Sequence, residues 1–251
     1  MFDLTISPSD NAAPSAGCPP VRTKAGQARR LVAGLALVLA AAPAWSAVFT
    51  VTNVNDDGPG SLRQAILAAN DQPGADEIRF AIPGDGPHTI AAATSLPGLN
   101  GTTVIDGYSQ PGAVRNTATH GTNAVIMIEL KGPSVSGTGG ISLLSGSSGS
   151  VVTGLSIHGF TTLFNITPGG NDCVIAGNFI GTSPDGVTRQ PGQATAITAS
   201  ADRCRIGGVW PADRNIIASA GLDALRALGN DVVVQGNLIG TDRHGTAALS
   251  N

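Results

Sequence analysis

The sequence predicts an all-β solenoid, in which short strands from successive turns of the chain stack in parallel. Three observations lead to this fold class. The 251 residues include 34 Gly and 16 Pro but only 12% charged and 4% aromatic residues, so the chain is rich in turns and too apolar for disorder. One short segment recurs along the chain at unequal intervals. The recurring segments are β-branched and lack the apolar recurrence at three and four residues that marks a helix.

Residues 1–47 have the pattern of a secretory signal sequence. Arg29 and Arg30 precede the apolar run LVAGLALVLAAA, and the small-residue stretch PAWSA follows it. The alternative is a transmembrane anchor, but a run of about a dozen apolar residues is short of the ~20 that span a bilayer. We therefore expect export, with the mature chain secreted or held at the outer cell surface.

Residues 48–75 are expected to form an amino-terminal cap made of a strand and a short helix. Ser61 and Gln64 form a capping-box pair at the start of the helix. An apolar stripe at helical spacing follows, formed by Leu62, Ala65, Ile66 and Ala69. A solenoid must shield its first apolar turn from water, and this helix is the candidate cover.

Solenoid turns are expected over residues 76–251. DEIRFAIPG places Ile78, Phe80 and Ile82 on one face, and TTVIDG supplies the next strand. VIMIELKG is expected to point three side chains inward, namely Ile126, Ile128 and Leu130. No capping unit precedes Asn251, so the last turn is expected to meet further turns of the same polypeptide or a partner that pairs with its edge.

The repeat aligns without internal gaps in SVVTGLSI, CVIAGNFI, CRIGG and VVVQGNLI. One column contains Val152, Ile175, Ile206 and Val234, and another contains Gly154, Gly177, Gly208 and Gly236. The glycines are expected at a sharp bend, where a Cβ would collide or φ must be positive. A hairpin turn is the alternative for Gly-Asn, but the fixed register across units favours stacked turns.

Three asparagines follow these glycines. Asn178, Asn215 and Asn237 are expected to tolerate a left-handed backbone and to bond the next turn through their amides. Residues 209–214 (VWPADR) and 181–192 are expected to leave the stack as loops.

GSLRQAILAAN, VIDGYSQPG and the GN(F/L)IGT repeats together resemble the bacterial secreted right-handed parallel β-helix proteins of pectin-lyase-like shape. Many of those proteins begin with a CSLREA-type motif. Gly60 stands here where that motif has Cys, and Gln64 stands where it has Glu. The resemblance covers residues 48–251 and implies an exported solenoid, but the matched motifs are structural and imply no catalytic residue.

No catalytic, metal-binding or cofactor site is predicted. Aspartates fall beside Gly, Pro or the repeated strands, where they suit turns and helix starts, at Asp56, Asp57, Asp106, Asp172, Asp185, Asp231 and Asp242. Asp185 and Asp242 are expected in near-equivalent turns. The four histidines share no ligand spacing, and no nucleophile or phosphate-loop motif occurs. From Val48 onward ten Lys and Arg stand against fifteen Asp and Glu, so we expect neither nucleic acid nor an anionic membrane surface as a partner.

Four residues are candidates for contact with a ligand. Trp210 lies in the 209–214 loop beside Asp213 and Arg214, and Tyr108 is the other aromatic candidate. The alternative is that Trp210 folds back over the solenoid.

Cys173 and Cys204 align in one column of adjacent units, so they are either a disulfide or an interior stack of free thiols.

These observations favour a structural, display or adhesive surface module without a catalytic site in this segment, with extracellular carbohydrate or a cell-surface molecule as its partner. The alternative is a polysaccharide lyase or glycoside hydrolase whose acidic cluster lies in loops or outside the segment. An enzyme predicts three or more outward carboxylates and a basic residue in one groove, whereas a stalk predicts isolated aspartates in turns.

Overall fold

The computed structural model describes residues 47–190, 193–218 and 220–249. The described residues belong to one compact unit, Ala42–Asn251. The predicted signal sequence lies outside the described residues, apart from Ala47. Among the described residues, no helix has the length and apolarity needed to cross a membrane.

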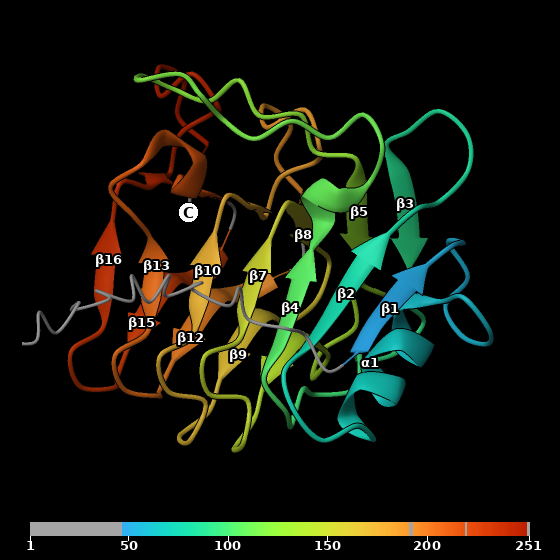
Figure 1. Cartoon of the computed structure of the whole chain (residues 1–251). Helices are drawn as coiled ribbons and strands as arrows, with labels where there is room; N and C mark the ends of the chain where they lie inside the picture. The colour runs from blue at the N-terminus through green and yellow to red at the C-terminus, as the bar shows by residue number, and fades with distance from the viewer. Residues whose placement is uncertain (1–46, 191–192, 219, 250–251) are drawn as a thin grey trace, which may run out of the picture. The chain divides into compact units, whose positions relative to one another are not determined.

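The fold is mostly β, with three parallel sheets and one α-helix, α1 (Leu62–Asn70) (Figure 1). The first sheet has the order β1 (Ala47–Val51), β2 (Asp76–Phe80), β4 (Thr103–Asp106), β7 (Val151–Thr153), β10 (Val174–Ala176), β13 (Arg205–Gly207) and β16 (Val233–Gln235). The second has the order β3 (His88–Ala91), β5 (Ile128–Lys131), β8 (Leu155–His158), β11 (Phe179–Ile180), β14 (Ile216–Ile217) and β17 (Leu238–Ile239). The third has the order β6 (Gly139–Leu143), β9 (Thr162–Ile166), β12 (Gln193–Ala199) and β15 (Ala220–Ala227).

From β7 onward the chain visits the three sheets in turn, and each visit adds a strand beside the strand of the previous visit. In the first sheet, the parallel register joins Val152 to Ile175, Ile175 to Ile206, and Ile206 to Val234. The apolar column predicted from the repeat is therefore confirmed. Val152 also pairs with Ile105, so the column extends to β4, before the recognisable repeat begins.

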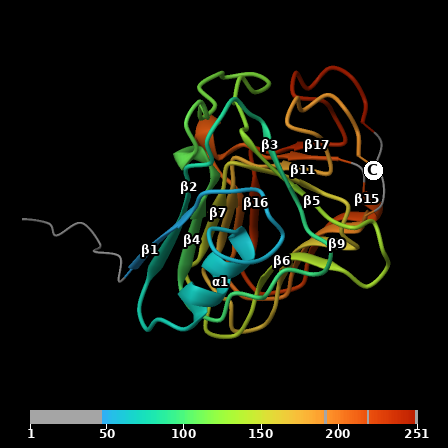
Figure 2. The same cartoon turned by 90° about the vertical axis from the view of Figure 1, so that its right-hand side faces the viewer.

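The main apolar core contains side chains from all three sheets and from α1. The predicted helical stripe is confirmed, because its four apolar residues are buried. Ser61 caps the helix, and its Oγ accepts the Gln64 N–H at 3.2 Å. The Ser61 N–H donates to the Gly58 carbonyl rather than to a Gln64 side chain, so only one half of the capping box forms. Figure 2 shows α1 in front of the strands at this end of the unit.

The segment before β5 departs from the expected pattern. Ile128 and Leu130 enter the main core as predicted, but Ile126 belongs to a second cluster with Phe179 and Ile216. Phe179 and Ile216 are register partners whose neighbours along the strands face the main core, so the second cluster lies on the other side of the second sheet. The prediction that Ile126 points inward is wrong because β5 begins only at Ile128, and the chain before it is a loop that covers this sheet.

The repeated glycines make the predicted bend with one displacement. Gly154, Gly177 and Gly236 have φ of +77°, +69° and +71°. In the third unit the positive φ of +82° belongs to Gly207 and not to Gly208. We attribute this shift from Gly208 to Gly207 to the inserted loop of residues 209–214. The Gly177 N–H donates at 3.0 Å to the carbonyl of Asp213, which is a residue of that loop.

The asparagines after the bends bond between successive repeat units as predicted. Their backbones are not left-handed, so that part of the expectation is wrong. The left-handed non-glycine residues of the repeat lie at another corner, at Asp172, Arg203 and Asp231, each just before a repeated strand. Gly149 has the equivalent conformation one unit earlier. Positive φ values therefore recur at two corners of the repeat, at glycines in one corner and mostly at other residue types in the other.

Candidate functional site

A groove of about 320 Å³ lies on the outer side of the first sheet, across β4, β7, β10 and β13. Val104, Val151 and Val174 are register partners along its floor. Their neighbours in the strands, such as Val152 and Ile175, are fully buried in the core. Because side chains alternate along a strand, the three valines face outward and form an apolar floor.

Asp106 and Arg115 form one end of the groove. The Arg115 guanidinium lies 3.0 Å from the Asp106 carboxylate, and it also donates to the Thr153 Oγ1 at 3.3 Å. Burial raises the pKa of Asp106 and outweighs the opposing effect of Arg115. This end therefore combines a half-buried carboxylate with a cation that is already paired.

Tyr108 holds this end together rather than facing the groove as a free contact. Its hydroxyl donates to the Gly177 carbonyl at 2.7 Å, and Arg115 lies over its ring at 4.4 Å. Burial raises the pKa of Tyr108 to about 12. Tyr108 thus positions Arg115, and its predicted contact with a ligand stays a prediction.

Asp213 and Arg205 form the other end, with a guanidinium–carboxylate distance of 3.1 Å. Asp213 ends the short 3₁₀ helix η2 (Pro211–Asp213), which begins after Trp210. Trp210 is 71% exposed, so the alternative in which it folds back over the sheet is wrong. Its side chain is available for contact on the loop that supplies Asp213.

Arg214 does not line this groove. Its guanidinium donates to the carbonyls of Ala118, Thr119 and Gly121 in a distant loop, and to that of Gly236. Of the four predicted contact residues, only Asp213 lines the groove. Trp210 lies on the loop that supplies Asp213, Tyr108 contacts Arg115 at one end, and Arg214 is directed elsewhere.

Both arginines of the groove were missed by sequence reasoning. Arg205 was detectable, because it occupies the outward column of Val151 and Val174 in the aligned repeat. Arg115 was not, because it lies in an irregular loop without periodicity. A third ion pair, Arg79 with Glu77 at 2.8 Å, lies on the neighbouring strand β2.

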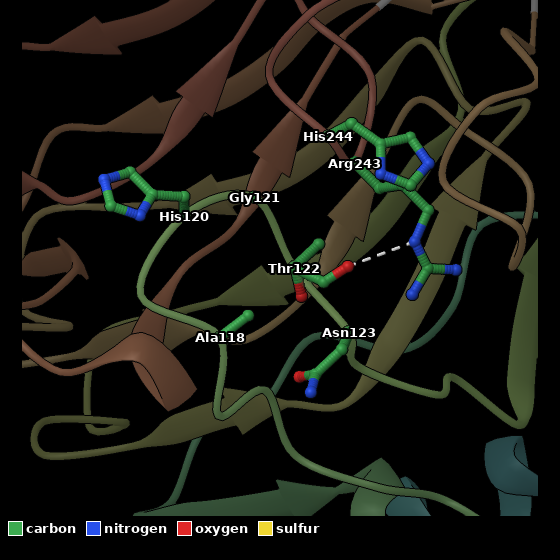
Figure 3. Close-up of a pocket in the computed structure, with 7 residues that line it drawn as sticks. All are labelled: Ala118, His120, Gly121, Thr122, Asn123, Arg243 and His244. Carbon is green, nitrogen blue, oxygen red and sulfur yellow. Dashed lines mark hydrogen bonds between the residues drawn. The ribbon is translucent and has the colours of Figure 1, made fainter.

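A second hollow, of about 460 Å³, lies between the loop of residues 118–123 and the Arg243–His244 turn (Figure 3). His120 and His244 stand on opposite sides of it. Arg243 donates to the carbonyls of Thr122, Ala124 and Asp185, at 3.1, 2.8 and 3.1 Å. The Arg243 guanidinium therefore holds neighbouring loops together, and this hollow is the space between two loops.

The other aspartates have the predicted turn roles. Asp185 accepts the N–H groups of Val187 and Thr188, and Asp242 accepts those of His244, Thr246 and Ala247. Burial raises the pKa of Asp242, but the hydrogen bonds from the Thr246 and Ala247 N–H groups lower it on balance.

The two turns are equivalent, as expected, but the aspartates occupy different positions in them. Asp242 corresponds to Ser183, since the Ser183 N–H donates to the Thr188 carbonyl just as the Asp242 N–H donates to that of Ala247.

Near the helix start, Asp56 pairs with Arg63 at 2.8 Å, while Asp57 accepts the Gly58 N–H. Within residues 47–190, 193–218 and 220–249, no three His, Cys, Asp or Glu side chains are grouped so as to hold a metal ion.

Cys173 and Cys204 are free, buried thiols in the structure, so the disulfide alternative is not formed. The Cys173 Sγ donates to the Ser147 carbonyl at 3.4 Å. A hydrogen bond with the Cys204 sulfur, and then burial, raise the pKa of Cys173. This thiol is thus held protonated and unreactive.

No protein-family model matches the sequence, and no curated protein matches it.

Proposed function

We propose that residues 48–251 form a right-handed parallel β-helix that serves as an exported display or adhesive module and binds a glycan in the groove of the first sheet. The single observation that supports glycan binding most directly is the composition of that groove. It has an apolar floor of valines, polar groups at both ends, and the exposed Trp210 on the loop at one end. Carbohydrate and other small-molecule sites combine apolar surface with a few oriented polar groups in the same way.

Two features support the β-helix. From β7 onward, parallel strands of the three sheets are visited in a fixed rotation, which is the order a coiled solenoid requires. The resemblance in the GSLRQAILAAN and GN(F/L)IGT segments supplies the right-handed sense. Export and a surface location are proposed from the signal sequence alone.

The groove favours binding over catalysis because its acidic groups are occupied. Two carboxylates line it, those of Asp106 and Asp213, and each is bonded to an arginine. An enzyme of this kind was expected to gather three or more carboxylates and a basic residue. A paired carboxylate is a poor general base, because its charge is already stabilised by its partner.

A glycoside hydrolase is the second candidate, and one observation favours it. Glycoside hydrolases use two carboxylates, one of which has a raised pKa and acts as the acid. Asp106 has a raised pKa and Asp213 lies at the opposite end of the same groove. Release of new reducing ends without unsaturated uronides from any polysaccharide by the purified chain would make this candidate the function.

Binding is tested with the chain from Val48 onward on an array of bacterial and plant glycans. We expect a defined set of glycans to be retained. Trp210→Ala should weaken binding about tenfold, the equivalent of about 1.4 kcal/mol. Leu222→Ala is the matched control, because Leu222 is an equally exposed apolar residue on the third sheet and should leave binding unchanged. An array without any retained glycan would refute the proposed function.

A further inference from the structure

The charges in and beside the groove are balanced within the protein. Three arginines and three carboxylates face outward from the first sheet and the loops beside it, and they form three ion pairs: Arg79 with Glu77, Arg115 with Asp106, and Arg205 with Asp213. The nitrogen–oxygen distances are 2.8, 3.0 and 3.1 Å. Each arginine that could bind a negatively charged ligand is therefore already paired with a carboxylate of the protein.

An acidic sugar would have to break one of these pairs. Taking Arg115 from Asp106 would leave a carboxylate with only 21% of its side-chain surface exposed, directly beside the carboxylate of the ligand. Removing one partner of a desolvated pair is costly because it leaves an uncompensated charge, and two like charges in one site repel each other. A bound cation could offset this repulsion, but the part of the chain that the structure describes groups no three acidic side chains for one.

The uncharged surface of the groove suits a neutral ligand. Val104, Val151 and Val174 are only partly covered and run across three adjacent strands, so a flat apolar ring face can lie on them. The Thr153 hydroxyl lies among them. The paired guanidinium and carboxylate groups keep N–H donors and lone pairs for neutral hydroxyls, because one ion-pair contact uses only a part of their hydrogen-bonding capacity.

We infer that the groove selects an uncharged polysaccharide whose pyranose rings have an apolar face, and that the ion pairs at its two ends exclude polyuronates. The inference rests on the proposed function and specifies the class of its ligand. The arginine–aspartate pairs then donate and accept hydrogen bonds with the hydroxyl groups of the sugar, and Trp210 supplies a stacking surface at one end.

Isothermal titration calorimetry with defined hexasaccharides tests the inference. The neutral probes are the hexamers of β-1,4-glucose, β-1,4-xylose and β-1,3-glucose, and the acidic probe is the hexamer of α-1,4-galacturonate. We expect at least one neutral hexamer to bind with an affinity that is the same at low and high salt, because no net charge is neutralised. The galacturonate hexamer should bind at least tenfold more weakly.

Asp213→Asn provides a gain-of-function test. This change keeps the shape of the side chain and frees the Arg205 guanidinium, so it should create affinity for the galacturonate hexamer that decreases with salt. Asp223→Asn, which breaks an exposed pair on the third sheet, is the matched control and should create none. Circular dichroism and the melting temperature verify that both variants fold; Asp106→Asn, which frees Arg115, replaces Asp213→Asn if that variant does not.

The outcomes separate the inference from the function on which it rests. If the unmodified protein binds galacturonate as well as or better than every neutral hexamer, the inference is overturned while glycan binding stands. If neither class binds and the array is also empty, both fail. Neutral binding that is weakened about tenfold in Trp210→Ala and kept in Leu222→Ala, with galacturonate binding only in the aspartate variants, supports both.

Discussion

At the scale of single residues, the asparagines after the glycine bends connect successive repeat units. The Asn178 Oδ1 accepts the Leu155 N–H at 3.0 Å, and the Asn178 N–H donates to the Asn215 Oδ1 at 2.8 Å. Asn215 and Asn237 repeat the arrangement one turn later, at 3.3 Å. The side chains thereby satisfy backbone groups at a place where the strands turn away and no ladder partner is available.

Replacing Asn178 with Ala should lower the free energy of unfolding by about 2–3 kcal/mol, because fully buried N–H and C=O groups lose their partners. Chemical denaturation monitored by circular dichroism measures the change. Asn100→Ala is the control, since Asn100 is exposed and should matter by less than about 0.5 kcal/mol. Equal losses in the two variants would contradict the structural role of Asn178.

The bend glycines permit a second comparison. Gly154 and Gly58 both have positive φ, but a Cβ on Gly154 would meet the Tyr108 backbone N at 2.5 Å, whereas a Cβ on Gly58 would meet nothing within 4 Å. Gly58→Ala should therefore cost about 1–2 kcal/mol, from backbone strain alone. Gly154→Ala should cost clearly more, and equal melting temperatures of the two variants would show that the contact is relieved easily.

At the scale of elements, the long loop after η1 (Gly107–Ser109) is held over the second sheet by two arginines. Arg214 donates to carbonyls of residues 118–121, and Arg243 donates to those of Thr122 and Ala124. Figure 1 shows this green loop reaching the red loops near the end of the chain. Its apolar residues Ala124 and Ile126 cover Phe179 and Ile216, so the loop also completes the second apolar cluster.

Arg214→Gln should loosen this loop without unfolding the sheets, because it removes charge-assisted hydrogen bonds to the carbonyls of Ala118, Thr119 and Gly121. Limited proteolysis should cleave the 111–125 segment faster than in the unmodified protein. Arg226→Gln is the control: its exposed pair with Asp223 contributes little, so cleavage should keep its rate. An unchanged cleavage rate in Arg214→Gln would contradict the proposed role of Arg214 in holding this loop.

The pair of Glu129 on β5 and His158 on β8 gives a pH-dependent term. The hydrogen bond with His158 lowers the pKa of Glu129, burial opposes it, and the bond from Thr89 lowers the pKa further. Because the folded-state pKa lies below the ordinary value of 4.5, the stabilisation is present above that value and is lost as pH falls through the lowered pKa.

Glu129→Gln should therefore lower the free energy of unfolding by about 1–2 kcal/mol at neutral pH. The difference from the unmodified protein should shrink as pH falls below 4.5, the ordinary value for Glu129. Urea denaturation over a series of pH values measures it. Asp223→Asn, in an exposed pair, should show only a small difference at every pH. A pH-independent difference for Glu129→Gln would assign its effect to packing.

At the scale of the whole molecule, the described unit contains one main apolar core shared by the three sheets and the helix, and both thiols are fully buried in it. In the chain from Val48 onward, Cys173 and Cys204 should react with a thiol-specific disulfide reagent only when the core opens, at the rate of unfolding. Val209→Cys, at a 68% exposed position, should react at once. Denatured chain that shows no free thiol before reduction would reveal a disulfide.

The regular parts of the fold were predictable and the irregular parts were not. The columns of Val152 and Gly154 could be read from the sequence because one short pattern recurs and strand side chains alternate. The outward position of Arg205 follows from the same alternation. Ile126 was misplaced because the alternating pattern continues through it, whereas the strand begins two residues later.

The sequence by itself determined the parallel apolar columns, the capping helix, the bends and the turn roles of most aspartates, since these depend on local residue type and on a repeat. Only the tertiary structure decided which charges meet. Arg115 reaches Asp106, Arg205 reaches Asp213, and Arg214 turns away to a distant loop. An ion pair depends on where irregular loops end in space, and neither periodicity nor propensity specifies that position.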